Sequence, residues 1–98
     1  MPYIKQDRRR VQGAFDLNDS IKKWNDEVPD GLCMGDFNYI FSLIAHKYVM
    51  LKGKNYQTLG EVREALSGAR DEFSRNVVFP YEDVKKDENG AVSKLDEN

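Results

Sequence analysis

Apolar residues recur at helical spacing along the first half of the chain. The earliest clear stretch places its apolar positions three or four residues apart, at Leu17, Ile21, Trp24 and Val28. Asp16 precedes this stretch and belongs to a residue type favoured at helix N-caps. The triplet at 29–31, Pro-Asp-Gly, follows it and is typical of a chain reversal. We therefore predict a helix over residues 17–28.

A second apolar stretch predicts a helix over residues 37–52, with Asp36 as its N-cap and Gly53 as the residue after its end. Met34 and Ile40 have the spacing of a hydrophobic staple around that N-cap. One apolar stripe comprises Phe37, Ile40, Phe41, Ile44, Tyr48 and Leu51. Further apolar positions lie outside the stripe, at Tyr39, Leu43, Val49 and Met50. Because two or three companion helices in so short a chain cannot cover this surface fully, we expect a homo-oligomer.

A third stretch begins with Thr58 and Glu61, the spacing of a capping box, and predicts a helix that runs to Val78. Its apolar positions alternate between spacings of three and four, at Leu59, Val62, Leu66, Ala69, Phe73 and Val77. Pro80 is expected to end or kink this helix, since proline lacks an amide donor. The connector 53–57 is short enough to join the two long helices as an antiparallel hairpin.

The remaining segments are less regular. Residues 2–13 are basic and are interpreted as a short helix or an arm. Residues 81–88 predict a further helical turn, 89–90 a chain turn, and 91–98 a flexible polar tail. These patterns together predict an all-α protein, with a single helical domain over residues 1–90 and a tail after it.

Composition narrows the function. The chain has 98 residues, 40% hydrophobic and 33% charged, with a formal net charge of -2. No apolar run is long enough for a membrane helix and no signal peptide is evident, so we expect a cytoplasmic protein. The single Cys33 and single His46 do not supply the ligand set of a structural metal cluster, so we expect no metal cofactor. No catalytic signature is present, so we expect neither an enzyme nor an organic cofactor.

Basic and aromatic residues give the most informative chemistry. Arg63, Arg70 and Arg75 lie on the third predicted helix, and Tyr81 follows it. Guanidinium groups can bind phosphate and an aromatic ring can stack on a base, so these residues suit a small anionic ligand. The alternative is that the arginines only form ion pairs on a solvated helix surface, with Glu64, Asp71 and Glu72.

Several strings resemble a widespread family of small proteins encoded by phages and prophages. They are residues 1–4 (MPYI), 35–39 (GDFNY), 72–83 (EFSRNVVFPYED) and 88–90 (ENG). The resemblance implies no particular reaction, but it singles out candidate binding residues in these strings. They are Asp36, Asn38, Tyr39, Glu72, Arg75, Tyr81, Glu82 and Asp83, together with Pro80. The chain departs from the family pattern at Ala91 and Ser93, where the family has an acidic and an aromatic residue.

Two functions remain open at this point. The first is a non-enzymatic, oligomeric binder that sequesters a small anionic ligand, such as a nucleotide immune signal, and so opposes bacterial antiviral defence. Sequestration needs affinity but no catalytic group. The second is a protein-interaction module that inhibits or redirects a host protein through exposed aromatic or arginine anchors. A DNA-binding role for the basic segment is less favoured, since the net charge is -2.

Overall fold

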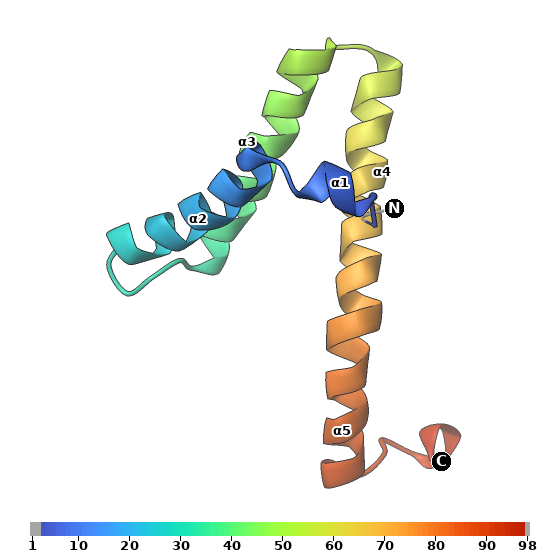
Figure 1. Cartoon of the computed structure of the whole chain (residues 1–98). Coiled ribbons are helices and arrows are strands. Elements are labelled where there is room, and N and C mark those ends of the chain that lie inside the picture. The colour runs from blue at the N-terminus through green and yellow to red at the C-terminus, as the bar shows by residue number, and fades with distance from the viewer. Residues whose placement is uncertain (1–2, 98) are drawn as a thin grey trace. The chain divides into compact units, whose positions relative to one another are not determined.

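The computed structural model describes residues 3–97, and every regular element in this range is helical (Figure 1). The α-helices are α1 (Gln6–Arg9), α2 (Gln12–Glu27), α3 (Met34–Lys52), α4 (Tyr56–Phe73) and α5 (Phe79–Asn89). A π-helical turn, Ser74–Val78, joins α4 to α5, and a 3-10 turn occupies Lys94–Asp96. The prediction of an all-α protein is confirmed for this part of the chain.

The chain divides into two compact units, and the division falls within α4. The N-terminal unit spans Tyr3–Arg63 and holds α1, α2, α3 and the first turns of α4. The C-terminal unit, from Glu64 onward, holds the rest of α4, the π turn, α5 and the 3-10 turn. The single domain over residues 1–90 and the flexibility of the tail stay predictions.

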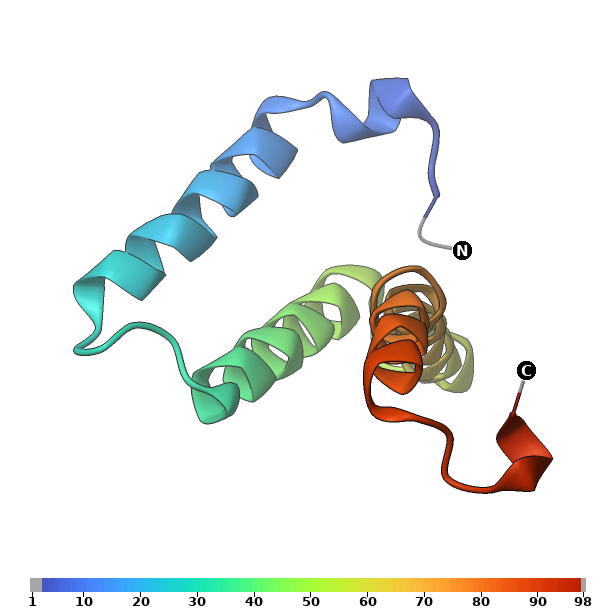
Figure 2. The same ribbon diagram turned by 90° about the horizontal axis from the view of Figure 1, so that it is seen from below.

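Helix α2 begins at Gln12 rather than at Leu17, so the prediction of Asp16 as its N-cap is wrong. Asp16 lies inside the helix, where its carboxylate accepts a hydrogen bond from the Gln12 side chain at 2.8 Å. This bond spans one helical turn and supports the earlier start, which the apolar spacing alone does not reveal. Between α2 and α3 the chain reverses direction (Figure 2), and Asn25 braces the connector by accepting the Leu32 amide at 2.8 Å.

Helix α3 begins at Met34, and its N-cap is Cys33 rather than Asp36. Asp36 is the third residue of the helix, and its carboxylate reaches back to accept the Cys33 amide at 3.0 Å. Met34 is 86% exposed within the first turn, so the predicted staple with Ile40 is also wrong. The predicted end is confirmed at Lys52, because Gly53 adopts a φ of 102° that favours glycine and its amide still donates to Val49.

Helix α4 begins at Tyr56, ahead of the predicted cap at Thr58. The Asn55 side chain accepts the Thr58 amide at 2.9 Å, which is the bond that an N-cap side chain makes. Thr58 itself is buried at 5% exposure. The capping-box prediction is therefore wrong, because the asparagine three residues earlier already satisfies the amide of Thr58.

Pro80 does not end the helix. The backbone remains helical from α4 through the π turn into α5, and Phe79 is in the α region directly before the proline. In the π turn the Phe79 amide donates to the carbonyl of Ser74, five residues back. This wider turn lies where the proline ring would otherwise crowd the carbonyl four residues before it. The sequence therefore continues as a helix at the cost of one irregular turn.

Little of the apolar surface is covered. Among the described residues, Ile40 is the one buried hydrophobic residue, at 5% exposure. Two aromatic contacts also lie within the N-terminal unit: Trp24 packs edge-on against Tyr39 at 6.2 Å between ring centroids, and Phe37 stacks on Phe41 at 4.9 Å. Most other large apolar side chains of α3 remain exposed to a third or more, which agrees with the surplus seen in the sequence.

Candidate functional site

The first group of candidate residues lies at the start of α3 in the N-terminal unit. Asp36 is half-buried, and the amide of Cys33 lowers the pKa of its carboxyl, with a further contribution from the Cys33 side chain. Hydrogen bonds to a carboxylate stabilise its ionised form, so the charged Asp36 side chain is favoured as the acceptor for the Cys33 amide. Cys33 is a free, exposed cysteine.

Asn38 and Tyr39 also have partners inside this unit. The Ser42 hydroxyl donates to the Asn38 side-chain oxygen at 3.5 Å, one turn further along the helix. The Tyr39 ring packs edge-on against Trp24, which connects α3 to α2. Helix capping and packing therefore account for the positions of Asp36, Asn38 and Tyr39 without a ligand.

The second group lies along the helix of the C-terminal unit. Glu72 is half-buried at the end of α4 and accepts the Asn76 side chain twice, at its carboxylate (3.3 Å) and at its carbonyl (3.1 Å). Asn76 belongs to the π turn, so this pair bridges the regular helix and the irregular turn. π turns inside α-helices are frequent at functional sites, and this one falls within the string that carries the family resemblance.

Arg75 lines a shallow hollow of about 400 Å³ beside the π turn. The other lining residues are Arg70, Asp71, Ser74 and Phe79. Arg70 contacts Asp71 at 3.8 Å, at the long end of ion-pair distances, and both side chains are exposed. Within residues 3–97 no carboxylate lies within 4 Å of Arg75. The hollow therefore presents one weakly paired and one unpaired guanidinium in the described chain.

Tyr81 lies beyond this hollow and is not part of its lining. Its ring is 63% exposed, and the Lys85 ammonium lies 5.5 Å from the ring centroid, a cation–π arrangement. Glu82 and Asp83 are exposed in the first turns of α5. The structure thus brings Arg75 together with Arg70 and Phe79, and places Tyr81 with Lys85.

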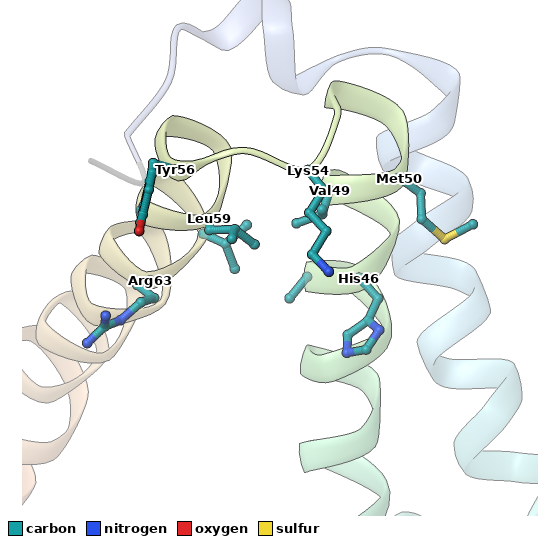
Figure 3. Close-up of a pocket in the computed structure, with 10 residues that line it drawn as sticks. His46, Val49, Met50, Lys54, Tyr56, Leu59 and Arg63 are labelled. Carbon is teal, nitrogen blue, oxygen red and sulfur yellow. The ribbon is translucent and has the colours of Figure 1, made fainter.

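Sequence reasoning missed a larger groove in the N-terminal unit, between the end of α3 and the start of α4 (Figure 3). Its volume is about 760 Å³, within the range of about 300–1,000 Å³ that small-molecule sites occupy. The lining residues are Ala45, His46, Val49, Met50, Lys54, Tyr56, Leu59, Gly60, Val62 and Arg63.

Figure 3 shows how the groove is built. Val49 and Leu59 lie between the two helices, and Lys54 extends from the connector into the same space. Tyr56 and Arg63 lie on the α4 side and His46 on the α3 side. The lining contains three basic side chains and no carboxylate.

One side-chain bond joins the walls near the groove. The Tyr48 hydroxyl of α3 donates to the Glu61 carboxylate of α4 at 3.4 Å. Loss of hydration raises the pKa of the Tyr48 phenol, and the nearby charge of Glu61 raises it further. The Glu61 carboxylate that accepts this bond is not part of the groove lining.

A comparison with protein families gives a match over residues 1–92 to the family described as Domain of unknown function (DUF6899). The chain belongs to this family. No curated protein and no solved structure matches it. Membership in DUF6899 is shown over residues 1–92, while the significance of the individual strings and the phage or prophage origin stay predictions.

The described residues of this DUF6899 chain also bear on two further features, metal-ligand groups and membrane-spanning helices. Within residues 3–97, no three His, Cys, Asp or Glu side chains gather closely enough to hold a metal ion. None of the described helices combines the length and the apolar character needed to cross a bilayer. Both hollows described above have arginine or lysine in their lining.

Proposed function

We propose that the protein is a non-enzymatic, homo-oligomeric binder that captures a small anionic ligand, such as a nucleotide used as a signal in bacterial defence against phages. The observation that carries this proposal is the unpaired Arg75 guanidinium beside Arg70 in the hollow at the π turn. An arginine fork binds phosphate in a planar, two-point arrangement, and its charge is constant at any physiological pH.

The surroundings of Arg75 support a ligand over a purely structural role. The alternative drawn from the sequence pairs the arginines with Glu64, Asp71 and Glu72, but only the weak Arg70–Asp71 contact is present among the described residues. Glu72 instead holds Asn76 within the π turn. Phe79 adds an exposed apolar face to the same hollow, against which the flat part of a ligand can lie.

Tyr81 enters the proposal as a second contact. Its ring is open to solvent on one side of α5, and its hydroxyl or its face can meet a ligand held at Arg75 by a neighbouring copy. Glu82 and Asp83, exposed beside it, are proposed to contact neutral or cationic parts of the ligand.

Self-association is supported by each unit taken alone. The C-terminal unit is a helix and a short 3-10 turn, which offer few surfaces for covering Leu66, Phe73 and Val84 within the unit. The N-terminal unit covers Ile40 and leaves most other large apolar residues of α3 exposed. Burial of such surface in an oligomer is favourable, because apolar area leaves water. We propose that an antiparallel α3–α4 hairpin is the element repeated in it.

The second candidate function is the protein-interaction module. It is favoured by the exposed aromatic side chains of α3, Phe37, Tyr39 and Phe41, which are the kind of residue that anchors protein interfaces. It needs no small ligand.

Calorimetric titration tests the proposal. Cyclic dinucleotides and mononucleotides are titrated into the wild type, Arg75→Ala, Tyr81→Ala and a matched control, Arg8→Ala, which removes the same charge from α1. Loss of a charge-assisted hydrogen bond is expected to weaken binding by about tenfold or more in Arg75→Ala. The control should bind as the wild type does, and light scattering should report an oligomer.

Two results would overturn this function. One is a wild type that binds none of these nucleotides and retains a host protein in a pull-down, which favours the interaction module. The other is an equal affinity of Arg75→Ala and Arg8→Ala for the bound nucleotide, which would show that Arg75 is only part of a solvated surface.

A further inference from the structure

The groove between α3 and α4 has no part in the site proposed at Arg75. All of its lining residues belong to the N-terminal unit, whereas Arg75 belongs to the C-terminal unit. It is also the larger hollow, at about 760 Å³ against about 400 Å³. Its chemistry can therefore be argued separately.

The floor of the groove is apolar. Val49 and Leu59 lie between the helices and Val62 is half-buried one turn along α4 (Figure 3). Such a surface offers water few hydrogen bonds. An apolar or flat aromatic group that covers it releases the water in contact with it, which is favourable. The Tyr56 ring, 97% exposed at the edge of the groove, offers a further face for stacking.

The nitrogen-bearing side chains of the groove are all basic. Lys54 extends into the space between the helices, while His46 and Arg63 stand on opposite walls (Figure 3). None of these three side chains has a hydrogen bond or an ion pair with another residue of the described chain. A wholly apolar occupant would strip water from Lys54 without giving it a partner, which is unfavourable. An occupant with a negative group supplies that partner.

We infer that this groove binds a nucleoside monophosphate, with the base on the apolar floor between Val49 and Leu59 and the phosphate at Lys54. The imidazole of His46 donates a further hydrogen bond to the phosphate or the sugar. The Arg63 guanidinium is turned away from α3 (Figure 3), so the Arg63 side chain must rotate to contact the same phosphate. The inference goes beyond the proposed function, because it assigns a nucleoside monophosphate to a second site, which lies in the other unit.

The chain offers a closely matched pair of variants. Lys54 lines the groove, and Lys52, two residues earlier at the end of α3, does not. Both side chains are exposed, so Lys54→Gln and Lys52→Gln remove the same charge from neighbouring positions without disturbing a core. Circular dichroism and light scattering on both variants test whether the fold and the oligomeric state are retained.

AMP is titrated calorimetrically into the full chain, with adenosine and inorganic phosphate as comparison ligands. We expect AMP to bind the wild type and Lys52→Gln equally, and Lys54→Gln about tenfold or more weakly. Adenosine and phosphate, each lacking half of the ligand, should bind at least about tenfold more weakly than AMP. Leu59→Ala should lower the affinity for AMP and leave the affinity for inorganic phosphate unchanged.

The inference is overturned if AMP does not bind, or if the two lysine variants bind it equally. It is also overturned if Lys54→Gln changes the oligomeric state while AMP affinity stays unchanged, because the groove would then be covered by a second copy. Arg75→Ala separates the two proposals. If AMP binding is retained in Arg75→Ala and lost in Lys54→Gln, the result supports the groove as the AMP site and not the hollow at Arg75. If AMP binding is lost in Arg75→Ala and retained in Lys54→Gln, the result supports the site at Arg75 and contradicts the groove.

Discussion

The two units hold their candidate sites in different ways. In the N-terminal unit, two helices and a three-residue connector, 53–55, place side chains from separate elements around one groove. In the C-terminal unit, the hollow at Arg75 is lined by residues that are close in sequence along one helical segment, and two of them belong to the irregular π turn. A site made from two packed elements depends on tertiary structure, whereas a site on one helix depends on local backbone geometry.

The buried residue of the N-terminal unit gives the largest expected effect. Ile40→Ala should lower the free energy of unfolding by about 2–5 kcal/mol, since it removes a buried side chain and leaves a cavity. Leu66→Ala in the C-terminal unit, where the side chain is 46% exposed, should cost less than about 1 kcal/mol. Denaturant unfolding measures both. An equal loss for Leu66→Ala would show that the helix of the C-terminal unit is packed in solution.

The caps of the two units provide a second comparison. Asn55→Ala should lower the free energy of unfolding by about 0.5–2 kcal/mol, because the Asn55 side chain accepts the hydrogen bond of the Thr58 amide at the start of α4. Ser93 accepts the Leu95 amide at 3.1 Å at the start of the 3-10 turn, but this turn has only three residues and its Leu95 is 99% exposed. Ser93→Ala should therefore leave the melting temperature unchanged. If Asn55→Ala also melts as the wild type does, Asn55 is not the effective cap of α4.

Glycines differ in the same way between the units. Gly53 has a φ of 102°, so Gly53→Ala should destabilise the end of α3 by about 1 kcal/mol or more. Gly68 lies within α4, and nothing lies within 4 Å of the position that an alanine Cβ would take there. Gly68→Ala should therefore stabilise the protein by about 0.5–1 kcal/mol. Thermal melts compare the two variants. A destabilised Gly68→Ala would mean that another helix lies closely against this position in solution.

The smallest expected effect concerns pH. The amide of Cys33 lowers the pKa of Asp36, so its carboxylate stabilises the folded state above the pKa of the unfolded chain. That contribution is lost as pH falls through the lower pKa of the folded state. Asp96 of the C-terminal unit has a pKa lowered by the amides of Ser93 and Val92, but it belongs to a three-residue turn that buries no residue.

We expect Asp36→Asn to reduce the acid dependence of the melting temperature and Asp96→Asn to leave it unchanged. Melts from neutral pH into the acid range below the usual carboxyl pKa provide the measurement. The same acid dependence in wild type and Asp36→Asn would show that another carboxyl group controls acid unfolding.

Local patterns in the sequence were sufficient for the helices and for some of their ends. The 3.6-residue period of apolar positions predicted α2, α3 and α4, and Gly53 predicted the end of α3. Helix starts were predicted less well, because a polar residue near a start has the chemistry of a cap whether or not it occupies the cap position, and the N-cap of α2 is Val11, which is apolar. At α3 the aspartate lies inside the first turn, and at α4 Asn55 precedes the expected cap.

The candidate site divides along the same line. The sequence by itself determined which basic and aromatic residues are available, and it located the string that holds Arg75. Tertiary structure alone decided that Lys54 and His46 share a groove with Tyr56 and Leu59, because these residues meet only where the connector brings the start of α4 near the end of α3. The continuation of the helix through Pro80 was likewise decided by the folded backbone, since a π turn relieves a clash that local propensity counts as a break.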